Sequence, residues 1–131
     1  MSDGTRITRT VETDFEVDEL WSLVADGDGW ARWMVDEADV DVAPGSAGTV
    51  VDDGVERSVR IDELDHHRLA FTWWPEGRPE LVSAVELVVL PAVGGSQLRV
   101  TEISMSASTV PALTWDVRMM LLVAQARAVF V

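Results

Sequence analysis

Cysteine is absent from the sequence, which excludes disulfide bonds, thiolate nucleophiles and thiolate metal ligands. The amino-terminal residues lack the charged-then-apolar pattern of a secretory signal, and the longest apolar runs, such as 119–124, are far shorter than the roughly 20 residues that cross a bilayer. The motifs of nucleophilic hydrolases, zinc proteases and nucleotide-binding proteins are missing too. We therefore expect a cytoplasmic protein with no metal, no cofactor and no membrane contact.

Lysine is absent as well: all ten basic residues are arginine, and 23 acidic residues bring the formal net charge to −13. Such a charge repels phosphate backbones and anionic membrane surfaces, so nucleic acid is not an expected partner. The exclusive use of arginine is typical of a GC-rich bacterial or archaeal genome.

The 131 residues suffice for one sizeable core and leave little room for a second, so 1–131 is interpreted as a single domain. A hydrophobic content of 47% with six tryptophans predicts a packed globule whose core is rich in rings.

The hydrophobic periodicity predicts an α+β chain with one strand, two short helices, further strands and a long final helix. The first strand is expected over 5–15. A first helix is expected within 17–30, with Val17, Leu20, Trp21 and Val24 at helical spacing and its end near Gly27 and Gly29, and a second short helical segment over 29–34. Turns rich in Gly, Pro and Asp then separate strands expected at 37–42, 50–51, 56–64, 68–74, 81–90 and 97–106.

The final segment, 114–131, is predicted to lie in a helix that covers the apolar face of the sheet; this helix begins near Pro111, which is tolerated in a first turn, with Ser108 or Thr109 as its cap. Asp116 and Arg127 fall on one polar stripe, and Arg118 and Gln125 fall on the opposite one. Between these stripes lie two apolar faces, the first with Trp115, Met119, Leu122, Ala126, Val129 and Phe130, the second with Val117, Met120, Leu121, Ala124, Ala128 and Val131.

Only one apolar face is needed to cover a sheet. We expect the face of Trp115, Met119 and Leu122 to do so, and the second face to find another partner. A homodimer through Val117, Met120, Leu121 and Ala124 is the hypothesis for that second face.

Several stretches resemble one known family. VDELWSLVADGDGWARWM is similar to the helix–helix segment of the START-like SRPBCC superfamily, in particular of the heat-shock ATPase activator homologue family. IDELDHHRLAFTWWPEG and SAVELVVLPAVGGSQLRVTE resemble that family's strand pair, and Trp115 with Met119 and Leu122 resembles its final helix. The resemblance runs from about Arg9 to the end of the chain.

The resemblance implies a helix-grip fold, in which a curved antiparallel sheet of about six or seven strands wraps around a long C-terminal helix. It also implies an elongated apolar cavity between sheet and helix, suited to a small apolar or aromatic molecule. Core packing is the alternative role for each tryptophan among the expected lining residues, which are Trp33, Phe71, Trp73, Val85, Leu87, Val100, Glu102, Trp115, Met119 and Leu122.

Glu102 is the one candidate for acid–base chemistry, because it shares a parity with Leu98 and Val100 and is expected to face inward. The alternative is a residue at the strand end that reaches solvent or pairs with an arginine. His66 and His67 fall in a hairpin turn, where an exposed turn is favoured over a metal site.

Three functions stay open. Binding of a small molecule is favoured; an enzyme of the polyketide cyclase or aromatase kind would need a buried group such as Glu102; and a protein-interaction module, such as an activator of a chaperone ATPase, would need a charged surface and no open cavity. The acidic run of Glu37, Asp39 and Asp41 is interpreted as a solvated sheet edge.

Overall fold

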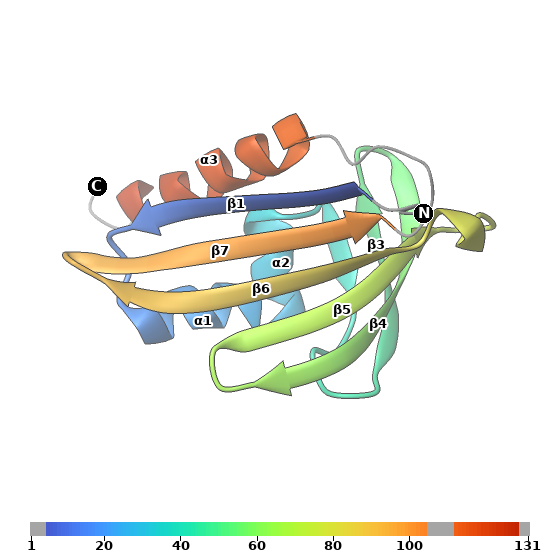
Figure 1. Ribbon diagram of the computed structural model, residues 1–131, viewed down its shortest axis with the longest axis horizontal. Helices are drawn as coiled ribbons and strands as arrows, with labels where there is room; N and C mark the ends of the chain where they lie inside the picture. The colour runs from blue at the N-terminus through green and yellow to red at the C-terminus, as the bar shows by residue number, and fades with distance from the viewer. Residues whose placement is uncertain (1–4, 105–111, 129–131) are drawn as a thin grey trace.

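The computed structural model describes residues 5–104 and 112–128, and the side chains of 6–104 and 114–125. Seven strands form a single antiparallel sheet in the order β1-β7-β6-β5-β4-β3-β2 (Figure 1). The strands are β1 (Thr5–Thr13), β2 (Glu37–Asp39), β3 (Ala47–Asp52), β4 (Val55–Asp65), β5 (Arg68–Pro75), β6 (Ser83–Ala92) and β7 (Gly95–Ser104). The helices are α1 (Val17–Val24), α2 (Gly27–Trp33), α3 (Ala112–Ala128) and a short 3₁₀ turn, η1 (Pro79–Leu81).

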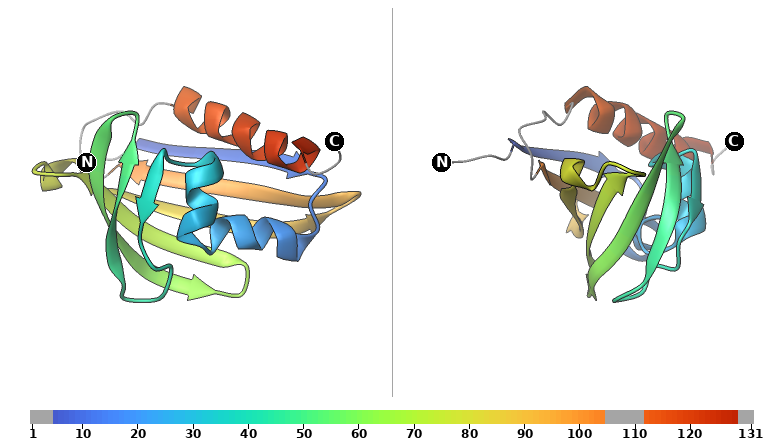
Figure 2. Two further views of the ribbon diagram at one scale, coloured as in Figure 1. Left: turned by 180° about the vertical axis from the view of Figure 1, so that it is seen from behind. Right: turned by 90° about the vertical axis from the view of Figure 1, so that its right-hand side faces the viewer.

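All three α-helices lie on one face of this sheet, as Figure 2 shows from behind. α3 packs along β1 and against α2, while α1 packs on β6 and β7. The strands turn steeply from β1 to β3, and a bulge in β4 between Ile61 and Glu63 adds to the bend. The sheet thereby wraps the helices, which confirms the expected α+β helix-grip architecture.

The element boundaries differ from expectation mainly near the second hairpin. β2 ends at Asp39, and β3 begins at Ala47, inside the segment 43–49 that was interpreted as a turn. Gly48 explains the difference, because a Cβ there would lie 2.4 Å from the backbone oxygen of Asp39. Only glycine lets the two backbones approach so closely, so its presence marks a paired strand as well as a turn.

α1 begins with a reciprocal cap, in which the backbone N–H of Glu16 donates to the Glu19 carboxylate at 3.1 Å. Its buried face presents Leu20, Leu23 and Val24 to the sheet. The helical spacing predicted Val17, Leu20, Trp21 and Val24 for this face. Leu20 and Val24 are buried as predicted, whereas Leu23 is also buried and Val17 and Trp21 are only partly buried.

α3 buries Trp115, Met119 and Leu122 against the sheet and leaves Val117, Met120, Leu121 and Ala124 exposed. The assignment of these residues to two faces is therefore confirmed over the described side chains. The side chains of Ala126, Ala128, Val129, Phe130 and Val131, and the expected cap at Ser108 or Thr109 with Pro111, lie outside the described residues.

Arg118 departs from the expected pattern of α3. It was placed on a polar stripe with Gln125, yet its side chain is only 6% exposed. The physical reason is that residue 118 follows Trp115 by three positions and precedes Leu122 by four, which puts it on the buried stripe. A polar residue on that stripe needs a polar partner inside the protein, and the structure supplies one, as described below.

The described part of the chain contains no helix with the length and apolarity that a membrane-spanning segment requires.

Candidate functional site

The inner face of the sheet changes in side-chain size from one end to the other. Directly opposed residues of β6 and β7 run from Val89–Leu98 and Leu87–Val100 through Val85–Glu102 to Ser83–Ser104. The first two pairs fill the space under the helices, whereas the last pair offers only short hydroxymethyl groups. Space therefore opens at the Ser83 end of the sheet, where α3 begins.

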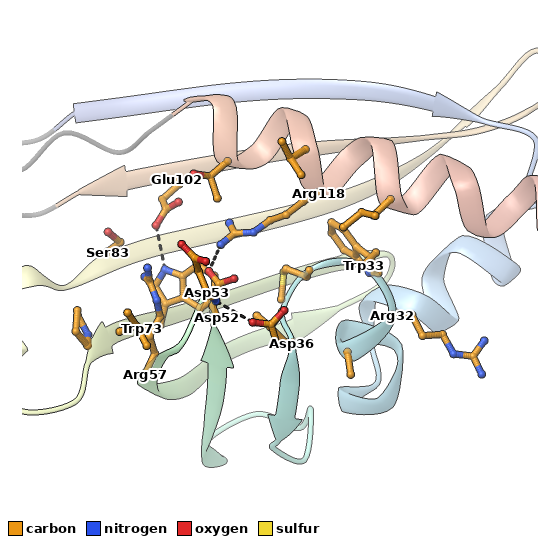
Figure 3. A pocket seen from close by; sticks show the side chains of 18 of the residues that line it. Arg32, Trp33, Asp36, Asp52, Asp53, Arg57, Trp73, Ser83, Glu102 and Arg118 are labelled. Carbon is orange, nitrogen blue, oxygen red and sulfur yellow. Dashed lines mark hydrogen bonds and ion pairs between the residues drawn. The ribbon is translucent and has the colours of Figure 1, made fainter.

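A pocket of about 880 Å³ occupies that space (Figure 3). Its walls come from the end of α2, the turn after β3, the facing parts of β4, β5 and β7, and the first turns of α3. Among its lining residues are Trp33, Trp73, Ser83, Glu102, Arg57, Asp52 and Arg118. The cavity expected between the sheet and the C-terminal helix is present, and its lining mixes aromatic with charged side chains.

Glu102 lies at the back of the pocket with 4% of its surface exposed. One carboxylate oxygen accepts a hydrogen bond from Trp73 Nε1 at 2.9 Å, and the other accepts one from Trp115 Nε1 at 2.7 Å. The carboxylate comes from β7, the Trp73 indole from β5 and the Trp115 indole from α3, so these two hydrogen bonds link the helix to the sheet. Glu102 is therefore not a strand-end residue that reaches solvent, which was the alternative interpretation.

Arg118 crosses the pocket from α3 and forms an ion pair with Asp52, at the end of β3, through its Nη2 atom. Its guanidinium carbon lies 4.4 Å from the centroid of the Trp115 ring and 5.4 Å from that of Trp73. Burial lowers the pKa of Arg118, while the charges of Asp52 and Glu102 act in the opposite direction. The ion pair with Asp52 and the nearby charge of Glu102 favour the charged form of the guanidinium.

Arg57, on β4, is the second cation of the pocket. Its guanidinium carbon lies 4.9 Å from the centroid of the Trp73 ring, so the guanidinium groups of both arginines contact this ring. The Nε atoms of Arg57 and Arg118 are buried and have no hydrogen-bond partner among the residues that the structure describes. Since backbone and side-chain donors in protein interiors are almost always paired, two such atoms in one pocket require an explanation.

Part of the mouth of the pocket is apolar, beside the exposed charged residues Arg32, Asp36 and Asp53. Val55, Val117 and Leu121 line this apolar part, and each is exposed over 44–48% of its surface. Val117 and Leu121 belong to the second apolar face of α3, so part of that face borders the pocket. A small molecule in the pocket would cover apolar surface that is otherwise in contact with water.

Of the ten residues predicted to line a ligand cavity, the structure brings three to the pocket: Trp33, Trp73 and Glu102. The other seven are buried in the core behind it, and they are Phe71, Val85, Leu87, Val100, Trp115, Met119 and Leu122. Aromatic contacts link the two groups, because the Trp73 centroid lies 5.1 Å from that of Phe71 and 6.5 Å from that of Trp115. The rings serve as packing and as pocket wall at once.

The indole N–H of each fully buried tryptophan donates a hydrogen bond to an acceptor within the protein. Trp30 donates to the Val24 carbonyl at 2.7 Å, and Trp33 donates to the Leu23 carbonyl at 3.0 Å. α2 is thereby held against the end of α1, which fixes Trp33 as one wall of the pocket.

Six charged residues that line the pocket were not predicted from the sequence: Arg32, Asp36, Asp52, Asp53, Arg57 and Arg118. For Arg118 a signal was available in its spacing from Trp115 and Leu122. For Asp52 there was none, because it was interpreted as part of a turn. For Arg57 a signal was available in its parity, which it shares with the buried Val59 and Ile61 of the same strand.

The remaining polar candidates lie away from the pocket. His66 and His67 form the turn between β4 and β5, as predicted. The Nε2 atom of His67 lies 3.6 Å from the Oδ1 atom of Asp18. Glu37, Asp39 and Asp41 are exposed. Within the described side chains, no group of three or more His, Cys, Asp or Glu residues has an arrangement that would hold a metal ion.

Residues 14–119 match the family model described as Activator of Hsp90 ATPase homolog 1-like protein. The chain belongs to this family. The assignment confirms the resemblance seen in the helix–helix segment and in the strand pair. None of the curated proteins matches the sequence.

Three solved structures with the same fold come from different proteins. CalU16 from Micromonospora echinospora is 25% identical, with a TM-score of 0.70 over 91% of this chain and 73% of CalU16. DynU16, a putative protein in the dynemicin biosynthetic locus, is 20% identical, with a TM-score of 0.74 over 97% of this chain and 48% of DynU16. The Aha1 dimer from Colwellia psychrerythraea is 12% identical, with a TM-score of 0.75 over 93% of this chain and 96% of that protein.

These likenesses show that the Hsp90 ATPase activator homolog 1-like chain has the fold of those proteins. Function has to be argued from the pocket, since one fold of this kind serves unrelated activities.

Proposed function

We propose that this protein binds a small molecule with an apolar or aromatic body in the pocket between the sheet and α3. The observation that carries the proposal is the pocket of about 880 Å³, which has Trp33 and Trp73 as walls and an apolar part of its mouth formed by Val55, Val117 and Leu121. Cavities of this size with aromatic walls and a few convergent polar groups are typical of small-molecule sites.

Binding is favoured over an enzymatic reaction by the state of Glu102. A general acid or base has to reach the reacting atom, and both oxygens of this carboxylate are already engaged by indole donors. Glu102 therefore acts as an anchor for Trp73 and Trp115. Binding is also favoured over a pure protein-interaction module, because such a module has no use for an open cavity.

Native mass spectrometry of the protein, beside a denaturing spectrum, is the direct test. A purified sample is expected to carry extra mass that disappears on denaturation, or to take up naphthalene as an apolar aromatic probe. Absence of copurified mass together with absence of naphthalene uptake would overturn the proposal.

The mouth of the pocket gives a matched pair of variants. Leu121→Ala is expected to weaken naphthalene binding by about fivefold, because about 1 kcal/mol of apolar contact is lost. Met120→Ala changes the neighbouring residue, which is 72% exposed and does not line the pocket, and should leave the affinity unchanged. Titration by quenching of tryptophan fluorescence measures both; equal affinities for the two variants would contradict the assignment of the mouth.

We also propose that α3 packs against a second copy of the chain through Val117, Met120, Leu121 and Ala124. Support comes from the exposure of these residues and from the similar Aha1 structure, which was solved as a dimer. Met120→Asp would place a charge in that interface. Sedimentation is expected to find a dimer for the wild type and a monomer for the variant, and a monomeric wild type would overturn the dimer.

A further inference from the structure

Arg57 differs from the other arginines that are buried or partly buried among the described side chains, because it has no carboxylate partner. The other three, Arg9, Arg68 and Arg118, each form an ion pair, with Asp116, Glu86 and Asp52 respectively. Arg57 forms neither an ion pair nor a hydrogen bond through its side chain with any described residue. Since partial burial of a cation without a counterion costs free energy, Arg57 leaves a place for an anion in the pocket.

The Nη end of Arg57 is the part of its guanidinium that a ligand can reach. The Nε atom is buried where the guanidinium stacks on Trp73, and cation–π attraction to this ring offsets part of the cost of that burial. The two Nη atoms have no hydrogen-bond partner among the described residues either, but unlike Nε they are not buried. Arg57 lines the pocket beside Trp73 (Figure 3), so these two N–H₂ groups border space that a ligand can fill.

The charges that line the pocket leave Arg57 without a counterion. They belong to three arginines and four acids, namely Arg32, Arg57, Arg118, Asp36, Asp52, Asp53 and Glu102. Arg32, Asp36 and Asp53 are exposed at the mouth, so the one excess acid lies where water screens its charge. Deeper in the pocket, Asp52 is bound to Arg118 and Glu102 to two indoles, so neither carboxylate pairs with Arg57.

Repulsion between Arg57 and Arg118 also favours an anionic ligand. Burial lowers the pKa of Arg118 and the charge of Arg57 lowers it further, whereas the charges of Asp52 and Glu102 raise it. The two guanidinium groups are therefore close enough to repel each other. A negative charge beside Arg57 would offset this repulsion, whereas a neutral group would leave it and a cation would add to it.

Val55 provides a surface for the apolar body of the same ligand. It precedes Arg57 by two residues on β4, so the two side chains lie on one face, about 7 Å apart along the strand. Val55 is 44% exposed and forms the apolar part of the mouth with Val117 and Leu121. A bicyclic aromatic acid is long enough to contact Arg57 and this apolar part at once.

We propose, on the basis of the small-molecule binding inferred above, that the ligand is an aromatic carboxylic acid whose carboxylate accepts hydrogen bonds from the Nη atoms of Arg57. Its ring system covers Val55, Val117 and Leu121. The planar fork of a guanidinium suits a carboxylate, and stacking on Trp73 holds this fork in place before a ligand arrives. Arg57 is thus the residue that determines the preference for an acid.

Three probes that share one ring system test the proposal on the whole chain. They are 1-naphthoate, its methyl ester and 1-naphthylmethylammonium, each measured at pH 7 by equilibrium dialysis. 1-Naphthoate is expected to bind roughly tenfold or more tightly than the ester, because the ester keeps the rings and both oxygens but lacks the charge that strengthens the hydrogen bonds. The ammonium probe should bind no more tightly than the ester.

Two variants assign the preference to its residue. Arg57→Met keeps an apolar stem over Trp73 and is expected to remove the advantage of 1-naphthoate. Its affinity for the ester should stay nearly unchanged, which also shows that the pocket has kept its shape. Arg32→Met is the matched control, since Arg32 is an exposed cation that lines the same pocket, and it should keep most of the advantage.

The outcomes separate this inference from the proposed function. An ester or an ammonium probe that binds as tightly as 1-naphthoate would overturn the acid site and leave the binding of an apolar body in place. An advantage that survives in Arg57→Met but is lost in Arg32→Met would move the acid to the mouth and overturn the role of Arg57. Failure of all three probes and of naphthalene to bind would defeat the proposed function itself.

Discussion

Replacement of Glu102 by leucine is expected to lower the free energy of unfolding by about 2 to 6 kcal/mol, although leucine is apolar and of similar size. The carboxylate is the acceptor for the indole N–H groups of Trp73 and Trp115. Leucine would leave both donors buried and unpaired, at about 1 to 3 kcal/mol each. Urea denaturation followed by circular dichroism measures the loss.

Two further variants make this result specific. Glu102→Gln keeps one carbonyl oxygen and turns an amide N–H₂ toward the second indole, so roughly half of the loss is expected. Thr101→Val alters the adjacent residue of β7, whose side chain lies on the opposite face near Thr8, and should stay within about 0.5 kcal/mol of the wild type. A Glu102→Leu protein as stable as the wild type would show that the two hydrogen bonds contribute nothing.

The same variant has a consequence for binding. Trp73 is both an anchored core residue and a wall of the pocket, and it carries the guanidinium groups of Arg57 and Arg118. A Trp73 ring released from Glu102 would no longer hold the two arginines in one arrangement. Stability and ligand affinity are therefore coupled through one carboxylate.

Much of the scaffold could be predicted because it follows from local periodicity. Alternation along β5, β6 and β7 gave the inner face, and helical spacing gave the buried face of α3 with Trp115 and Leu122. Glu102 was found for the same reason, since parity alone places it inward between Val100 and Ser104. Its partners were not found, because the pairing of Glu102 with two indoles depends on how strands and helix meet in space.

The charged end of the pocket could not be predicted from periodicity. Asp52 and Arg118 are 66 positions apart in the sequence, and they meet only because the sheet bends enough to bring the end of β3 beneath α3. The bulge after Ile61 and the close backbone approach at Gly48 contribute to that bend. Arg57 is the exception, because it lies before the bulge and shares its parity with the buried Val59 and Ile61, so alternation along β4 does place it on the inner face.

Arg118→Met is expected to destabilise the protein by about 3 kcal/mol, the lower end of the usual cost of breaking a buried ion pair. Methionine keeps the aliphatic stem of the arginine, so the loss comes from the guanidinium, that is, from its charge and its stacking on Trp73 and Trp115. Asp52 would keep its negative charge without a partner, and its side chain is only 15% exposed. The lower end is appropriate because that exposure lets some water reach the carboxylate. Urea unfolding of the two proteins measures the difference.

A double-mutant cycle separates the ion pair from the packing of Arg118. Asp52→Leu alone leaves the guanidinium with Glu102 as its nearest opposite charge, so it too should destabilise the protein. In Arg118→Met/Asp52→Leu both charges are gone, and the double variant is expected to recover about half or more of the stability lost in Arg118→Met. Recovery should be incomplete, because the stacking of Arg118 on Trp73 and Trp115 and its charge opposite Glu102 are not restored. Strictly additive losses would mean that the pair is not coupled, and that Arg118 is held in the pocket by the two rings alone.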